Sequence, residues 1–421
     1  MGSFEGVKIC FLADKHDLHD DRIYWKMAVP LHERGAQVHY LLLGDREESG
    51  VTKEGIRYRM RKVRTFSGNP YLNFLLKRLD PKNSYRQLFR DAAVLKADIY
   101  HLHDLWINRI GPGLKALPHR PAVFYDAREP YAEDYRSQYG SGTLSRVLVG
   151  SFASWVDRWE KRQALHYDLV IANEPLVAKR FADALGEGRS AVLFNYADLG
   201  IFERAVGDGS DQGGEHVEYD LIYCGMLTEQ RGAWALLESV RLARERMPGI
   251  RVLLLGRIDP PALKARMEEF ITRHRLGNQV EIREQVPYEQ VARFYRKSRI
   301  GLILWQPEPN LKIKMPIKLF EYMAFGLPVI GSDFGHIGRV IDSEGCGISV
   351  DPESPEEIVG AIELLLKKDG PYEEMSRKGK EATRREFSWA REFERLLGFY
   401  EKALATRKSK HPNHSGDERS A

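Results

Sequence analysis

The sequence predicts an α/β protein built from two parallel, doubly wound sheets. Short apolar runs alternate with longer segments whose apolar residues recur at helical spacing, which is typical of strand–helix–strand units. Such units place their strands in parallel with right-handed connections. The alternation occurs in two series separated by a glycine-rich stretch, and a chain of 421 residues suits two or three domains.

The composition is that of a protein with sizeable hydrophobic cores. Hydrophobic residues make up 43% of the chain and charged residues 29%, and both values are ordinary for a globular protein. The net charge of +4 is too small to indicate nucleic-acid binding, and no nucleic-acid-binding motif is found. We therefore expect no nucleic-acid partner.

Cysteine spacing and hydropathy favour a cytoplasmic location. Cys10, Cys224 and Cys346 are far apart and odd in number, so they predict neither a disulfide framework nor a metal site. The apolar run at residues 7–13 is too short for a signal sequence. No run approaches the roughly 20 apolar residues of a membrane-spanning helix. Peripheral contact with the inner face of a membrane is left open.

The first series begins with a buried strand at residues 7–13, a helix at 20–34 and a second strand at 38–43. The loop after the first strand has no G-x-G-x-x-G, so a dinucleotide cofactor is not indicated. Two histidines and three aspartates lie between residues 16 and 21. They leave two interpretations open, a metal site or, more commonly, solvated side chains.

A basic segment follows at residues 56–66. A strand there would put Arg57, Arg59 and Arg61 on one face. One interpretation is an edge strand protected from aggregation by its charge. The other is a patch for an anionic acceptor or for anionic lipid headgroups. Further basic residues follow in a region expected to be helical, namely Lys77, Arg78, Lys82, Arg86 and Arg90.

Two strands of the first series, at residues 97–104 and 121–126, run into polar loops. Open α/β sheets bind ligands at the carboxyl ends of their strands, so these loops are candidate site segments. For Asp126 and Glu129, capping of the following helix is an equally strong interpretation. A long helix at 144–167 and strands starting at 168 and 190 complete the series.

The second series begins after the best linker of the chain, the glycine-rich stretch at residues 207–214. Its first strand, at 220–224, leads into a loop from Gly225 to Gly232, and a helix is expected from about residue 233. A glycine turn, a cation at Arg231 and a helix N-terminus together form a cradle suited to phosphate.

A loop, a helix and a strand meet within residues 315–333. Pro316 suits a helix start, and Gly326 suits its left-handed end. Backbone amides at such a start attract phosphate. Lys318 adds a positive charge there, and Glu321 adds an acceptor one turn later. The simpler interpretation leaves both side chains merely solvated on an amphipathic helix.

The rest of the second series repeats the pattern. Strands are expected at 251–256, 280–284, 300–305 and 345–350, with a variable loop at 306–314. Helices are expected at 288–297, 355–367, 372–387 and 389–405, and the polar tail at 406–421 is expected to be disordered.

The family 4 glycosyltransferases, which have the GT-B fold, carry a donor-site motif that resembles Lys318-x-x-Glu321-Tyr-Met-Ala-x-Gly-x-Pro-Val-Ile. The loops after residues 103 and 125 are similar to the H-x-H-D and Y-D-x-H-E stretches of the same group.

The resemblance implies two Rossmann-like domains facing a central cleft. The acceptor domain would be residues 1–202, the linker 203–218 and the nucleotide-sugar domain 219–387. A helix at 388–405 would cross back to the first domain before the tail at 406–421.

The resemblance also implies roles for single residues. On the donor side Glu321 would hydrogen-bond the ribose, while the sugar and diphosphate would lie against Gly225, Arg231, Lys318 and Leu319. On the acceptor side, the resemblance implies that the loop after the first strand contacts the acceptor. The catalytic candidates are Asp104, Arg128 and Glu129, and the acceptor-binding candidates are Arg22 and His103.

Three positions depart from the family pattern. Ile313 replaces the first glutamate of a common pair, Met226 replaces an arginine, and Arg128 replaces a histidine that lies near the reacting sugar in relatives. Arg231 stands where the family has a lysine and can take its role. Arg128 cannot act as a base, but it can bind a phosphate or carboxylate. No D-x-D motif is found, so we expect neither a metal nor a cofactor.

The implied activity is transfer of a sugar, with retention, from a UDP- or GDP-linked donor to a glycan or lipid-linked acceptor. The implied setting is cell-surface polysaccharide or glycolipid synthesis. The departures leave open a catalytically weak or inactive homologue that acts as an assembly or regulatory subunit. A sugar-nucleotide epimerase of the same fold is a third interpretation.

Overall fold

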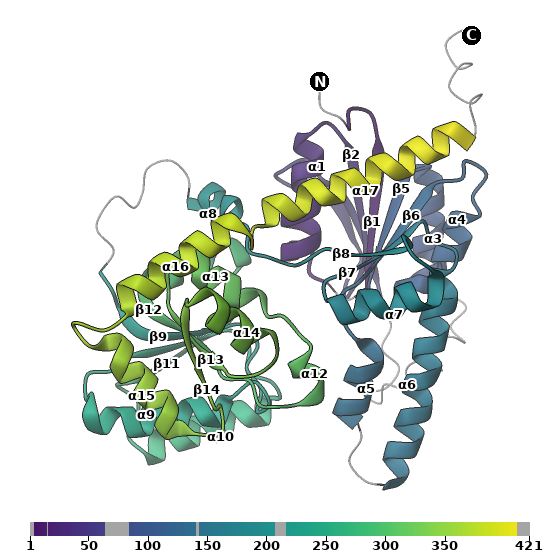
Figure 1. Ribbon diagram of the computed structural model, residues 1–421. Helices are drawn as coiled ribbons and strands as arrows, with labels where there is room; N and C mark the ends of the chain where they lie inside the picture. The colour runs from purple at the N-terminus through teal and green to yellow at the C-terminus, as the bar shows by residue number, and fades with distance from the viewer. Residues whose placement is uncertain (1–3, 15, 64–83, 140–142, 207–215, 411–421) are drawn as a thin grey trace. The chain divides into compact units, whose positions relative to one another are not determined.

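The chain divides into two compact units. The computed structural model describes residues 4–14, 16–63, 84–139, 143–206 and 216–410 (Figure 1). Unit 1 comprises residues 1–194 and 392–421, and unit 2 comprises residues 195–391. Each unit carries a largely or wholly parallel sheet between helices, so the predicted doubly wound α/β class is confirmed. The chain passes between units at 194/195 and 391/392, whereas the sequence predicts the end of the first domain at residue 202 and the start of the returning helix at residue 388.

The sheet of unit 1 has its strands in the order β3-β4-β2-β1-β5-β6-β7-β8 among the described residues. Every pair is parallel except β3 with β4. The strands are β1 (Lys8–Asp14), β2 (Gln37–Gly44), β3 (Glu48–Val51), β4 (Arg57–Lys62), β5 (Ile99–His103), β6 (Ala122–Ala127), β7 (Leu169–Ala172) and β8 (Ser190–Val192). Ala13 pairs with His103, and His103 pairs with Asp126. The loops after β1, β5 and β6 therefore leave the sheet side by side, at the carboxyl ends of these parallel strands.

Helices cover both faces of this sheet. One face is covered by α3 (Ser84–Leu95), η2 (Trp106–Arg109), α4 (Gly111–Lys115), α6 (Thr143–Ala164) and α7 (Pro175–Leu185). The other face carries η1 (Asp21–Ala28), α1 (Val29–Glu33) and α17 (Trp389–Lys410). On that face Tyr400 of α17 packs its ring against His101 and Phe124. The short helix α5 (Tyr131–Tyr139) packs on α6.

The basic strand β4 differs from its predicted edge position. It lies between β2 and β3, and β3 takes the edge, because the turn after β3 returns the chain antiparallel to β4. Arg59 and Arg61 contact Asp91 of α3 at 2.9 and 2.7 Å. Two of the three arginines are therefore neutralised within unit 1. The expected strand end at residues 64–66, and Lys77, Arg78 and Lys82, lie outside the described residues.

The C-terminal helix is longer than predicted. Disorder was expected from residue 406, but α17 continues to Lys410. Arg407 explains the extension, since Nη1 lies 2.8 Å from Asp98 Oδ1 and Nη2 donates to the His119 carbonyl oxygen at 2.9 Å. Residues 411–421 lie outside the described part of the chain.

The described sheet of unit 2 is wholly parallel, in the order β11-β10-β9-β12-β13-β14. Its strands are β9 (Tyr219–Cys224), β10 (Val252–Leu255), β11 (Val280–Arg283), β12 (Ser298–Ile303), β13 (Val329–Ser332) and β14 (Gly347–Val350). One face is covered by α9 (Ala233–Arg246), α10 (Pro261–Arg273) and α15 (Pro355–Leu366). The other carries α11 (Ala292–Arg296), α13 (Ile317–Phe325), α14 (Gly335–Glu344) and α16 (Tyr372–Arg385).

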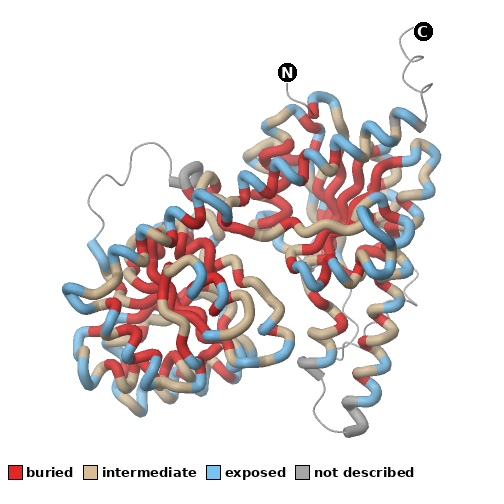
Figure 2. The backbone as a smooth tube through the Cα atoms, in the orientation of Figure 1, coloured by how far each residue is buried: buried red, intermediate tan, exposed pale blue. Residues whose placement is uncertain are grey.

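Three short helices complete unit 2, namely α8 (Leu199–Val206), η3 (Tyr288–Gln290) and α12 (Pro309–Lys312). The last of them lies within residues 306–314, for which the sequence predicts a variable loop. Figure 2 shows the strands of each unit as buried backbone beneath more exposed helices. Among the described helices, none combines the length and apolar character needed to cross a bilayer.

Candidate active site

The loop that leaves β9 needs glycine at two positions. Gly225 has φ +104° and Gly232 has φ +92°, a left-handed region that side chains disfavour. A Cβ at Gly232 would also lie 2.0 Å from the Leu304 carbonyl oxygen. Gly232 directly precedes α9, so the predicted arrangement of a glycine turn before a helix N-terminus is present.

Lys318 lies beside this turn in the first turn of α13. The residue is buried, and its Nζ has no hydrogen-bond partner among the described residues. Nζ sits 3.8 Å from the centre of the Tyr223 ring, and a Cβ at Gly225 would lie 3.3 Å from it. Burial is the main effect and lowers the pKa of Lys318 to about 7; Arg231 also lowers it, while Cys224 and Glu321 oppose the shift.

Glu321 is held by two tyrosines that the sequence interpretation missed. Tyr288 donates to Oε1 at 2.5 Å and Tyr295 donates to Oε2 at 2.6 Å. The residue is 3% exposed, so these bonds fix the carboxylate inside the fold. Tyrosines at residues 288 and 295 stand on η3 and α11, and nothing local in the sequence links them to a glutamate on α13. The ribose contact of Glu321 stays a prediction.

The other two predicted donor residues, Arg231 and Leu319, differ in whether their side chains can contact a ligand. Arg231 donates from Nη1 to the Met226 carbonyl oxygen at 3.3 Å, and its guanidinium lies 5.7 Å from the Trp305 ring centre. Leu319 is fully buried and its amide donates to the Pro316 carbonyl oxygen at 3.1 Å. Leu319 therefore supplies packing beneath the start of α13.

In unit 1 the two predicted acceptor-binding residues, Arg22 and His103, lie in the core. Both are fully buried. Arg22 begins η1 with its side chain turned inward, where Nε donates to Asp126 Oδ2 at 2.8 Å and Nη2 to the Leu193 carbonyl oxygen at 3.0 Å. A guanidinium held this way stabilises the core instead of presenting itself to an acceptor.

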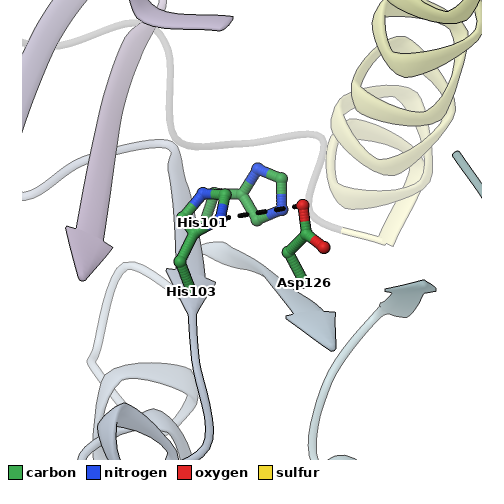
Figure 3. Close-up of side chains that lie close together, drawn as sticks. All are labelled: His101, His103 and Asp126. Carbon is green, nitrogen blue, oxygen red and sulfur yellow. Dashed lines mark ion pairs between the residues drawn. The ribbon is translucent and has the colours of Figure 1, made fainter. Parts of the chain in front are cut away.

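His101, His103 and Asp126 form a buried cluster whose potential ligand atoms lie within 4.8 Å of one another (Figure 3). Two imidazoles and a carboxylate are a set that transition metals use. However, Arg22 already neutralises Asp126, so a divalent ion would add uncompensated charge to a fully buried place. Burial lowers the pKa of His101 to about 3, which keeps its ring neutral, and its Nδ1 lies 2.6 Å from the Tyr400 hydroxyl. The cluster is better described as part of the core.

A second group of charged side chains lies at the carboxyl ends of the same strands, and it is partly exposed. His16 Nε2 is 2.6 Å from Asp104 Oδ2, and His16 Nδ1 is 3.0 Å from Asp20 Oδ2. Arg128 Nη1 lies 3.3 Å from Asp20 Oδ1. Burial and Arg128 lower the pKa of His16, but Asp104 and Asp20 outweigh them and raise it to about 10. We call these four residues the His16 cluster.

The structure thus brings together Asp104 and Arg128, two of the three predicted catalytic residues. Asp104 has φ +76°, which is uncommon for a residue with a side chain, and Tyr131 donates to its Oδ1 at 3.2 Å. Glu129 is half-buried beside the start of α5, and its carbonyl oxygen accepts from Tyr131 N at 2.9 Å. His16 and Asp20 belong to the loop that the sequence singles out as a group, but their contacts with Asp104 and Arg128 could not be predicted from it.

A cavity of about 1390 Å³ adjoins the cluster in unit 1. The loop from His16 to His19 forms one wall, and residues 43–46, β3, the turn at 52–53, β4 and Val63 form the rest. Its lining mixes both signs of charge, as with Asp45 and Lys53. His16 is the member of the cluster that reaches the cavity.

Comparison with known proteins gives one consistent family. Residues 211–382 match the family described as "Glycosyl transferases group 1". A Methanocaldococcus jannaschii protein named as an uncharacterized glycosyltransferase is 21% identical over 327 residues, which cover 73% of this chain and 76% of that protein. The amylovoran biosynthesis glycosyltransferase AmsK of Erwinia amylovora is 26% identical over 153 residues, 36% of each chain.

Solved structures show the same fold. Sucrose-phosphate synthase from Thermosynechococcus elongatus superposes with a TM-score of 0.70 at 17% identity, covering 95% of this chain and 100% of that one. Anabaena HepE, solved in complex with UDP, superposes with a TM-score of 0.66 at 15% identity over 94% and 100% of the two chains.

This chain therefore has the GT-B fold of the superposed structures, and it matches the group 1 glycosyltransferases over residues 211–382. It is a nucleotide-sugar-dependent glycosyltransferase.

Proposed function

We propose that the protein transfers a sugar, with retention, from a UDP- or GDP-linked donor to a glycan or lipid-linked acceptor in polysaccharide or glycolipid synthesis. The observation that carries the donor side is Lys318. A buried amine without a hydrogen-bond partner is costly, and an anionic ligand beside the Gly225 turn would relieve that cost.

In the proposed reaction, unit 2 stabilises the diphosphate as it leaves the sugar. As the bond to the sugar breaks, negative charge grows on the diphosphate oxygens. Lys318, Arg231 and the backbone amides near residues 315–317, before α13, are the groups proposed to stabilise that charge. Glu321, fixed by its two tyrosines, is the acceptor proposed for the ribose hydroxyls.

The finer parts of the proposal rest on relatives. HepE was solved with UDP, which favours a uridine donor here. AmsK is named for the synthesis of amylovoran, which favours a polysaccharide setting. Retention follows from the resemblance to family 4.

A thermal-shift screen with UDP, GDP, ADP and their common sugar conjugates tests the donor site. A ligand that binds only the folded protein must raise the melting temperature. We expect one nucleotide series to stabilise the wild-type protein, and to stabilise Glu321→Gln less. Glutamine keeps the shape of the glutamate and spares the two tyrosine contacts better than alanine would.

The matching sugar nucleotide is then incubated with candidate glycans, and the anomeric configuration of the product is read by NMR. An inverted product would refute retention. If no nucleotide raises the melting temperature at millimolar concentration, the proposed donor site is refuted. The protein would then be better explained as an inactive homologue.

A further inference from the structure

One side of α6 is exposed along most of the helix, and Figure 2 shows exposed and buried positions alternating along it. Successive residues of an α-helix are about 100° apart, so positions that recur every three or four residues lie on one side. On the buried side of α6 these positions are Ala153, Val156 and Glu160. We call the opposite, exposed or partly exposed side the α6 face, which consists of Val147, Leu148, Ser151, Trp155, Arg158 and Arg162.

The apolar part of the α6 face is large for a surface in water. Val147 and Leu148 are each 63% exposed. A single exposed apolar side chain is common, but adjacent ones beside an aromatic residue mark a candidate contact surface. Trp155 lies about two turns further along and is half-buried, with its ring stacked on those of Phe152 and Trp159. Its apolar ring and polar N–H are the combination found at the boundary between lipid and water.

The charged part of the α6 face has one sign only. Arg158 and Arg162 are exposed, and no described residue forms an ion pair or hydrogen bond with either side chain. The face contains no acidic residue. On α16, by contrast, exposed basic residues are paired along the helix, as Arg377 is with Glu381. The α6 face therefore combines exposed apolar side chains with uncompensated positive charge.

The basic strand β4, where the sequence leaves open a contact with anionic lipid headgroups, is less well placed for this role. Two of its arginines, Arg59 and Arg61, are already paired with Asp91 of α3. The two arginines of the α6 face have no such carboxylate. Among the described residues, α6 is thus the better candidate for contact with an anionic surface.

We propose that the α6 face is a docking surface for an anionic lipid bilayer, with α6 lying in the plane of the membrane interface. Val147, Leu148 and Trp155 would enter the boundary between headgroups and acyl chains, while the two arginines extend to the lipid phosphates. A second copy of the chain is a poorer occupant, because the face has no carboxylate to pair with the arginines that it would bury.

The inference goes beyond the proposed function and does not rest on it. Docking on a bilayer requires neither a donor nor an acceptor. If the protein also transfers sugar as proposed above, docking favours the lipid-linked acceptor over a glycan free in solution.

The first arm of the test is sedimentation of the full-length protein with vesicles of phosphatidylcholine that contain phosphatidylglycerol. We expect the wild-type protein to bind, and Val147→Ser/Leu148→Ser to bind at least about tenfold more weakly, because less apolar area enters the bilayer. Leu176→Ser is the matched control, since Leu176 on α7 is 57% exposed and outside the α6 face. Unchanged melting temperatures show that the variants are folded.

The second arm separates charge from apolar contact. Arg158→Gln/Arg162→Gln should weaken binding to the anionic vesicles by about tenfold and leave binding to pure phosphatidylcholine unchanged. Raising the salt concentration from about 0.1 to about 0.5 M should weaken binding of the wild-type protein more than that of this variant. Lys380→Gln/Arg384→Gln, an exposed basic pair with the same spacing on α16, is the matched control.

The third arm locates the contact. Bromine-labelled lipids quench indoles that enter the bilayer interface, and the chain has seven tryptophans. We expect vesicles of these lipids to quench the wild-type fluorescence and to quench that of Trp155→Phe much less. Trp234→Phe, on α9 of unit 2, should retain the quenching.

Three results would overturn the proposal. One is a wild-type protein that does not sediment with anionic vesicles at low salt. Another is binding that Val147→Ser/Leu148→Ser and Leu176→Ser reduce equally, which would place the contact elsewhere. The third is a wild-type dimer, seen by light scattering, that Val147→Ser/Leu148→Ser makes monomeric without any change in vesicle binding. The α6 face would then be an interface between copies. None of these results depends on whether a nucleotide sugar binds.

Discussion

Arg22 and Lys318 are both buried cations, one in each unit, yet their surroundings are opposite. Arg22 is met by the Asp126 carboxylate at 2.8 Å and by a backbone carbonyl. Lys318 meets an aromatic ring and a glycine turn, and its Nζ lacks a hydrogen-bond partner among the described residues. A buried charge is costly unless it is paired. We therefore expect Arg22 to contribute to stability and Lys318 to bind an anionic ligand.

The difference teaches how to separate core from site in this fold. Both side chains are buried and both are basic, so neither burial nor positive charge identifies a ligand-binding cation. The partner does. A buried cation that is paired with a carboxylate of the protein is already stabilised. A buried amine without such a partner is stabilised when an anionic ligand binds to it.

The largest expected effect is at the paired cation. Arg22→Met should lower the free energy of unfolding by about 3–5 kcal/mol, because Asp126 is left buried and unpaired. Denaturant unfolding measures the loss, and Arg57→Met on the exposed side of β4 is the control. A loss below about 1 kcal/mol would mean that the ion pair is not what holds Arg22.

The unpaired cation should behave in the opposite way. Lys318→Met should weaken binding of the nucleotide diphosphate by about 10- to 100-fold, the usual worth of a hydrogen bond to a charged group. Its melting temperature should not fall, because the apolar side chain removes an unsatisfied amine. Lys312→Met, at an exposed position of the same segment, is the control. A destabilised Lys318→Met with normal affinity would reverse the assignment.

The pH dependence follows from the lowered pKa of Lys318, about 7 against an ordinary 10.5. Between these values the folded, empty protein binds fewer protons than the unfolded chain, so this group makes stability rise with pH across that window. A bound diphosphate favours the charged amine, so affinity should fall by up to about tenfold per pH unit above pH 7. Titrations from pH 6 to 9 measure both trends, and a flat affinity would contradict the assignment.

The smallest effect is expected at a paired but more exposed place. Asp91→Asn should cost about 1 kcal/mol, since it weakens the contacts of Arg59 and Arg61 near the surface. Nucleotide affinity should not change. Chemical denaturation measures the cost, and a change in donor binding would show that β4 communicates with unit 2.

The fold was predictable because its signals are local. The alternation of strands and helices, the left-handed Gly326 after α13 and the glycine turn before α9 can each be recognised within a few residues. The family motif on α13 works in the same way, since Lys318 and Glu321 stand three residues apart.

Partners distant in the chain were not predictable. Arg22 is predicted to contact the acceptor because the family resemblance gives that role to its loop, but its side chain pairs with Asp126, 104 residues away, and points inward. The tyrosines that hold Glu321 are 33 and 26 residues distant. The prediction that β4 is an edge strand was wrong for a similar reason. Residues 48–51 have no strong strand pattern, yet they pair with β4.

The most direct test of the donor site is isothermal titration of UDP and GDP at pH 8 in two buffers of different ionisation enthalpy. If Lys318 receives the diphosphate, binding by the wild-type protein should take up close to one proton, and binding by Lys318→Met should be weaker and take up none. Equal affinity for the two proteins, with no proton uptake by either, would show that the amine beside Gly225 is not the diphosphate site.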